Sequence, residues 1–185
     1  MEALIRAVRP EDWPKCKELR LAALRDPMAS IAFLETYVQA AAKPDEHWRE
    51  RAAGSRGLLR TRQFVAEEPD GRWTGSVTAL VERAGADTVF GGMPEADQTH
   101  LVGVFVRPER RGTGIARALL ESAVAWSWSL DEPRVTRVRL YVHEHNTRAR
   151  ACYEKAGFTV TGATVPVAGD ERARELELAV ARAEF

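Results

Sequence analysis

A glycine-rich hexapeptide, Arg111-Gly112-Thr113-Gly114-Ile115-Ala116, is the segment whose residue types most clearly suggest chemistry. It follows an apolar segment, predicted to be a strand over 99–106, and it opens a predicted helix over 115–128. The first N–H groups of a helix have no intrahelical partner and lie at the positive end of the helix dipole. Glycines let a ligand approach the backbone closely. The N–H groups of 112–117 are therefore predicted to bind an anion such as pyrophosphate.

Other phosphate-binding loops, and a loop with no ligand, compete with this interpretation. A Walker loop needs Gly-Lys followed by Ser or Thr, whereas Gly114 is followed by Ile115. A dinucleotide fingerprint needs Gly or Ala where Arg117 stands, and it needs a preceding βαβ pattern that is absent here. A glycine-rich helix start without a ligand remains open on the loop alone.

Two motifs together give a more specific resemblance. Arg111 to Ala116 fits the pattern Gln/Arg-x-x-Gly-x-Gly/Ala. Asn146 to Phe158 fits Asn-x-x-Ala-x-x-x-Tyr-x-x-x-Gly-Phe. In this order the two motifs resemble those of the GNAT superfamily of acetyl-CoA-dependent N-acetyltransferases, most clearly over 99–162. The resemblance implies that acetyl-CoA is the acetyl donor and that its pyrophosphate lies on the loop.

The second motif implies roles for one helix, predicted over 147–156. Asn146 is expected to cap this helix and, from the resemblance, to lie near the pantetheine arm. Ala149 and Tyr153 share a face because they are four residues apart. The resemblance makes Tyr153 the acid that protonates the leaving thiolate, although a structural aromatic residue is the alternative. Cys152 is expected to face the core, so no acetyl-cysteine is predicted.

The strand before the loop is predicted to hold the thioester. Gly103 lies in its interior, where glycine often marks a bulge or a close backbone approach. The resemblance places backbone N–H groups of Val104, Phe105 and Val106 along the cofactor. An N–H group at the carbonyl would stabilise the negative charge that develops on its oxygen.

The acceptor amine must also lose a proton. An alkyl amine with a pKa of about 10.4 is neutral in roughly one molecule in 2,500 at pH 7, which costs about 4.6 kcal/mol. His100, at the start of the strand, has a side chain whose ordinary pKa suits a base. Glu35, in a region that usually walls the acceptor site, and Glu67, at a strand end, are further candidates, as is a water relay.

Hydrophobic periodicity predicts an α/β fold with a mixed, mainly antiparallel sheet and helices on both faces. Pro69-Asp70-Gly71 indicates a hairpin turn, and 83–98 is predicted to be a loop. Predicted helices cover 13–25, 33–42, 45–53, 115–128 and 147–156; predicted strands cover 3–8, 63–67, 74–82, 99–106, 135–142, 158–161 and 174–180.

Composition narrows the class of protein. The 185 residues favour a single domain over 1–185, and 27 basic against 27 acidic residues give no reason to expect a nucleic acid or a membrane surface as partner. The chain has two cysteines, no recognisable signal peptide and no metal-ligand spacing, so a cytoplasmic protein without a metal is expected.

The predicted activity is direct transfer of acetyl from acetyl-CoA to a primary amine, with a small molecule as acceptor because the segment 32–35 resembles small-molecule members of the family. A protein N-terminus or lysine is the alternative acceptor, and a non-catalytic acyl-CoA sensor is the alternative class. A homodimer through the C-terminal strand is expected from the habit of the family alone.

Overall fold

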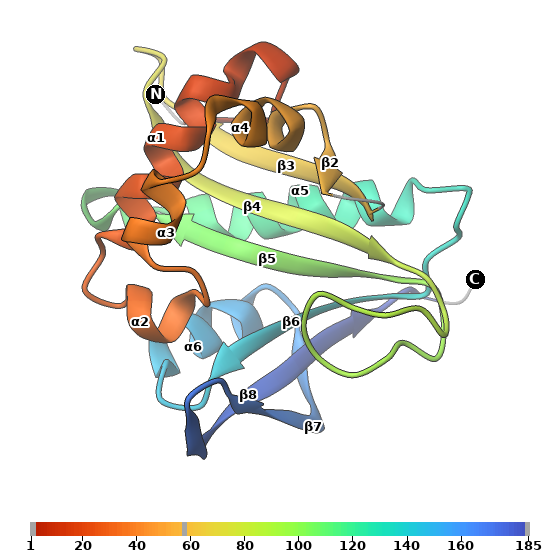
Figure 1. The fold of residues 1–185 in the computed structure, drawn as a ribbon. Helices are drawn as coiled ribbons and strands as arrows, with labels where there is room; N and C mark the ends of the chain where they lie inside the picture. Colours follow the sequence, from red (N-terminus) through yellow and green to blue (C-terminus); the bar gives the residue numbers. More distant parts are fainter. Residues whose placement is uncertain (1–2, 57–58, 184–185) are drawn as a thin grey trace.

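The fold is a single twisted sheet with helices on both faces, seen in a computed structural model that describes residues 3–56 and 59–183 (Figure 1). The strands run in the order β1-β3-β4-β5-β6-β8-β7, and β2 pairs with β3 outside this order. They are β1 (Leu4–Ala7), β2 (Ser55–Arg56), β3 (Leu59–Glu67), β4 (Trp73–Glu82), β5 (Gln98–Val106), β6 (Arg137–His143), β7 (Thr159–Val167) and β8 (Asp170–Ala181). All neighbours are antiparallel except β5 and β6, which confirms the mainly antiparallel sheet.

Helices cover the sheet because its strands present apolar residues to both sides. The helices are α1 (Trp13–Leu24), α2 (Ala29–Ala32), α3 (Tyr37–Ala41), α4 (Asp45–Ala52), α5 (Ile115–Trp128) and α6 (Thr147–Lys155). Phe64 and Ala66 of β3 pack in one core with α5, whereas Val65 between them packs in a second core with α1. This alternation is the period of two expected of a strand. Figure 1 shows α1 to α4 in front of the sheet and α5 behind it.

The predicted helix over 33–42 starts too early, because a non-helical segment over 33–36 separates α2 from α3, and only 37–41 is helical in that range. Phe33 ends α2 with extended dihedral angles. The Thr36 side chain then accepts a hydrogen bond from the N–H of Gln39, whose side chain accepts one from the N–H of Thr36. This reciprocal capping starts α3 at Tyr37, so the chain between Phe33 and Thr36 is free to line a cavity.

The predicted strands 63–67 and 158–161 are too short, since β3 begins at Leu59 and β7 ends at Val167. The loop predicted over 83–98 is present up to residue 97, and Gln98 begins β5.

The parallel pair β5 and β6 separates after only three residue pairs. Gln98, Thr99 and His100 pair with 137–139, and the ladder stops there. Beyond it, β5 continues toward the loop before α5 and β6 toward the start of α6, and the two strands no longer pair with each other. We call this divergence the split. Figure 1 shows the loop before α5 and the start of α6 at the same end of the sheet as the split.

Candidate active site

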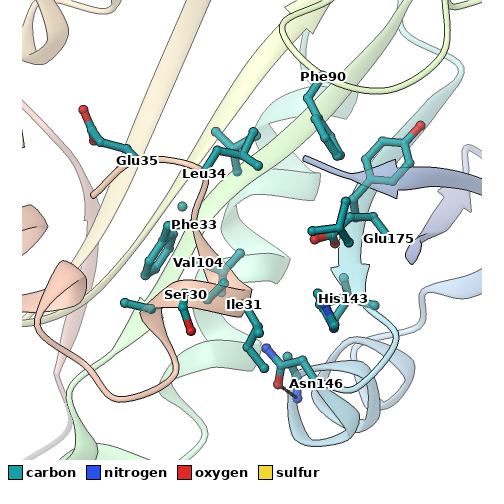
Figure 2. A pocket seen from close by; sticks show the side chains of 18 of the residues that line it. Ser30, Ile31, Phe33, Leu34, Glu35, Phe90, Val104, His143, Asn146 and Glu175 are labelled. Atoms are coloured by element: carbon teal, nitrogen blue, oxygen red, sulfur yellow. Dashed lines mark hydrogen bonds between the residues drawn. The ribbon is translucent and has the colours of Figure 1, made fainter. Parts of the chain in front are cut away.

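A cavity of about 580 Å³ occupies the split. One side is formed by 101–104 of β5, and the other by 141–143 of β6 together with Glu175 of β8. Residues 29–37 and the loop residues Val89 and Phe90 cover it, while Asn146, Ala149 and Tyr153 of α6 border it. Figure 2 shows Ser30, Ile31 and Phe33 facing His143 and Glu175 across this space.

Gly103 shapes the β5 wall through a bulge. The register between β4 and β5 shifts so that Phe105 pairs with Ser76 but Val102 pairs with Thr78, which leaves two β5 residues opposite one. Gly103 has a φ of +64°, a conformation that L-residues rarely adopt. The bulge predicted at Gly103 is thus confirmed, and it leaves Gly103 and Val104 outside the ladder on the side of the cavity.

The predicted cofactor strand contributes unequally to the cavity. Val104 lines it, whereas Phe105 packs against α1 and Val106 packs in the core with α5. Any contact of Phe105 or Val106 with a ligand would therefore come from the backbone.

The loop before α5 presents a run of unpaired donors. Within the part of the chain that the structure describes, the N–H groups of 112–117 donate no hydrogen bond, and the first to do so is that of Ala118, to the carbonyl of Gly114 at 3.0 Å. Gly114 has a φ of +87°, and a Cβ built there would meet nothing within 4 Å. The ends of these N–H bonds are therefore open to an anion at the positive end of the α5 dipole.

The other side chains of the loop hold it in place. Arg111 forms an ion pair with the buried Asp26, and its Nε donates to the carbonyl of Val106 at 2.9 Å. Thr113 Oγ1 donates to the carbonyl of Arg110 at 2.7 Å, and the exposed Arg117 pairs with Glu121 at 2.7 Å. These contacts fix the loop against the end of β5. Ile115 is buried in the core, and Ala116 packs beside it.

The α6 residues predicted from the second motif line the cavity together. Asn146 Oδ1 accepts a hydrogen bond from the N–H of Ala149 at 3.2 Å, so the predicted cap is confirmed (Figure 2). Tyr153 is only 9% exposed, and burial raises the pKa of its hydroxyl far above the usual value, with a charge on Glu175 adding to the rise. Cys152 is half-buried and does not line the cavity.

The predicted base candidates occupy three different environments. Glu67 lies outside the cavity, and its ion pairs with Arg6 and Lys15 hold its pKa at about 2 despite partial burial. Glu35 lines the cavity but pairs with Arg20 at 3.0 Å and with Lys43. Burial tends to raise the pKa of Glu35, but those two cations outweigh it and the pKa falls. Figure 2 shows its carboxylate turned away from Glu175 and His143.

His100 lines the cavity from within a buried polar network. Its Nδ1 lies 3.0 Å from Glu82 Oε1, and both side chains are 2% exposed. Arg139 joins Glu82 to Glu177, which accepts a hydrogen bond from the Tyr141 hydroxyl at 2.9 Å. Burial lowers the pKa of His100, and Glu82 opposes this only in part. The network therefore fixes the position of the His100 ring, and burial disfavours its protonated form.

Sequence reasoning missed two cavity residues, Glu175 and His143. They face each other as Cα partners on β8 and β6. Glu175 and Glu177 stand two residues apart in a segment that alternates charged and apolar residues, so the sequence alone does not distinguish one glutamate from the other. A prediction that β8 pairs with β6 would have placed Glu175 and Glu177 on the same face of the sheet as His143. That pairing is the feature from which Glu175 could have been found.

Residues 3–56 and 59–183 lack two further features. They contain no group of three or more His, Cys, Asp or Glu side chains that could hold a metal ion. In the same residues, every helix is too short or too polar to traverse a bilayer.

Comparison with known proteins identifies the family. Residues 27–158 match the model of the acetyltransferase (GNAT) family. A mycothiol acetyltransferase of Beutenbergia cavernae is 40% identical over 67 residues, which cover 36% of this chain and 22% of that protein. A mycothiol acetyltransferase of Salinispora arenicola is 33% identical over 118 residues, which cover 63% of this chain and 32% of that protein. The chain thus matches no more than about a third of the length of these relatives.

A solved structure shares the fold over the whole chain. The structure of yncA from Salmonella typhimurium with its cofactor acetyl-CoA superposes with a TM-score of 0.70 at 20% identity, over 100% of this chain and 96% of that one. The family match, the split sheet and the loop before α5 agree, and the chain belongs to the GNAT family of acetyltransferases.

Proposed function

We propose that this protein transfers the acetyl group of acetyl-CoA directly to the primary amine of a small molecule. The observation that carries the proposal is that a cavity lies in the split between β5 and β6, while six consecutive N–H groups are unpaired among the described residues in the loop and helix start at the same end of the sheet (Figure 1). A thioester joined to a pyrophosphate needs a slot and an anion site of this kind.

The residues present fit such a donor. The N–H groups of 112–117 would hold the pyrophosphate, and the open space above Gly114 leaves room for its oxygens. The small side chain of Ala149 would leave space for the pantetheine arm beside Asn146. The bulge at Gly103 would present backbone donors of β5 to the thioester carbonyl, where they stabilise negative charge on oxygen.

Tyr153 would supply the proton for the leaving sulfur. Its hydroxyl has no hydrogen-bond partner among residues 3–56 and 59–183, so it is free to donate to a ligand atom. Burial keeps this hydroxyl protonated. Burial disfavours a thiolate as well, so the proton affinities of the two groups rise together and transfer stays feasible.

A small acceptor is favoured by the cover over the cavity. Residues 29–37 and Phe90 enclose it from two sides, whereas an extended peptide would need an open groove. Acetylation of a protein N-terminus or lysine remains the second candidate, since the sequence motifs serve both. Because two relatives are named mycothiol acetyltransferases, the acceptor of that reaction belongs among those tested first.

The test is an acceptor panel in which release of the coenzyme A thiol is followed by absorbance. The proposal expects turnover with a subset of small primary amines and little with peptides. Turnover confined to peptide N-termini or lysines would replace the small-molecule acceptor. Binding of acetyl-CoA without turnover on the whole panel would favour a sensor.

A further inference from the structure

Glu175 is a cavity carboxylate that has no part in the acetyl transfer as proposed so far. It lies on β8 and lines the cavity with its neighbours across the sheet. Within the described part of the chain, its side chain forms no hydrogen bond and no ion pair. The other cavity carboxylate, Glu35, is held by Arg20 and Lys43. A partly buried carboxylate without a cation is costly unless a ligand supplies one.

The strand register aims Glu175 at the site where the acetyl group would be transferred. Glu175 pairs with His143 of β6, and antiparallel partners project to the same face of a sheet with Cβ atoms about 5 Å apart. Both residues border the cavity, as do Tyr153 and Asn146 of α6. Figure 2 shows Glu175 and His143 on one wall, opposite Ser30 and Ile31.

We propose that Glu175 binds the protonated amine of the acceptor and removes its proton. This inference rests on the proposed function, and it names the base that the sequence left open among His100, Glu35 and Glu67. The acceptor class follows from it: a primary amine that enters as a cation and carries an apolar or aromatic body. The apolar or aromatic part of the amine would contact Leu34, Phe90 and Tyr141, which line the cavity.

The proton affinity of Glu175 suits this role. Burial raises its pKa to about 7, so it is ionised in a large fraction of molecules near neutral pH and is a stronger base than an ordinary carboxylate. The titratable cavity residues on the neighbouring elements are His143 and Tyr141 on β6 and Tyr153 on α6. Its partner on β7 is Val165, and α2 carries no titratable residue.

The proposed step is balanced in protons and electrons. Glu175 takes one proton from the ammonium and later releases it to solvent. The amine lone pair then forms the C–N bond to the thioester carbon, and the C–S bond breaks with its electron pair on sulfur. Tyr153 gives its proton to that sulfur, and the second amine proton, lost after the C–N bond forms, restores Tyr153. Each turnover therefore yields an amide, a free thiol and one proton.

The experiment compares Glu175→Gln with Glu171→Gln, which makes the same change at an exposed position of the same strand. For each variant, kcat/KM for an accepted amine is measured from pH 6 to pH 10, and acetyl-CoA affinity is measured by calorimetry. We expect Glu175→Gln to lower kcat/KM at pH 7 by about a hundredfold. Glu175→Gln should also abolish the rise of kcat/KM near pH 7. The difference in kcat/KM between the two variants should narrow toward pH 10, because the fraction of amine that is already neutral increases.

Acetyl-CoA affinity and thermal unfolding should stay at the level of Glu171→Gln, which shows that Glu175→Gln is folded and loaded. Glu175→Asp keeps the carboxylate, so it should recover part of the activity and also the rise of kcat/KM near pH 7. The inference is overturned if Glu175→Gln stays within about threefold of Glu171→Gln with the same pH profile. A wild-type protein that binds no acetyl-CoA would instead refute the proposed function itself.

Discussion

The start of α5 and the wall formed by β6 and β8 are built from different atoms, although both border the same split. At α5 the donors are backbone N–H groups, and the side chains of Arg111 and Thr113 only hold the loop in shape. At the other wall β8 is paired on both edges, with β6 and with β7, and the side chains of His143 and Glu175 border the cavity. A site made of backbone N–H groups binds its ligand only while the loop keeps its conformation. A site made of side chains can change its ligand through a single substitution. We call the residues that would bind acetyl-CoA the donor half of the site and those that would bind the amine the acceptor half. The two halves should respond differently to mutation.

Tyr153→Phe should produce the largest effect that separates the two halves. In the proposed mechanism the hydroxyl supplies the proton for the leaving sulfur, so its removal should lower kcat by about a hundredfold. The affinity for acetyl-CoA and the KM for the amine should change little, because the ring still fills its place in the core. Steady-state kinetics with calorimetry would check this. An unchanged kcat would assign Tyr153 to packing alone.

His100→Gln should affect stability more than chemistry. It leaves the buried Glu82 without its imidazole partner, so the free energy of unfolding should fall by about 1–3 kcal/mol. The pKa of His100 is lower in the folded protein than in the unfolded chain, so the unfolded chain binds a proton at His100 more readily. The free energy of unfolding of the wild type should therefore decline as pH falls below about 6.5. The variant should lose that part of the decline.

Denaturation in urea at several pH values would measure both effects of His100→Gln. A variant with wild-type stability but without the rise of kcat/KM near neutral pH would make His100 the base and would remove Glu175 from that role.

Asn146→Ala should have the smallest effect of the three. Loss of the cap on α6 should cost about 1 kcal/mol of stability. The affinity for acetyl-CoA should weaken severalfold if Asn146 also contacts the pantetheine arm, while the amine KM stays the same. Thermal unfolding and calorimetry would separate the two. A change in amine KM alone would move Asn146 to the acceptor half.

The sequence predicts the geometry of the loop before α5 well, because that geometry depends on local backbone conformation, whereas its role in binding acetyl-CoA stays a prediction. Glycines at 112 and 114 and a helix start imply open N–H groups whatever the rest of the fold does. The bulge at Gly103 is equally local. The single domain, the cytoplasmic location and the homodimer stay predictions.

The acceptor half depends on contacts between distant residues, so the sequence predicts it poorly. Glu35, Glu67 and Glu175 are the same side chain, and what distinguishes them is whether the fold places a cation beside each one. Arg20 reaches Glu35 and Arg6 reaches Glu67, but no such partner reaches Glu175 in the described residues. The capping box at Thr36 can be read in the sequence, whereas the helix predicted over 33–42 begins before it.

The most direct test of the donor site is calorimetric titration of acetyl-CoA into the wild type, Gly114→Trp and Gly71→Trp. Gly71 also has a positive φ, but it lies in the turn between β3 and β4, away from the split. We predict micromolar binding by the wild type and by Gly71→Trp, near −8 kcal/mol, and at least a hundredfold weaker binding by Gly114→Trp. No binding by the wild type, or equal binding by all three proteins, would contradict the account.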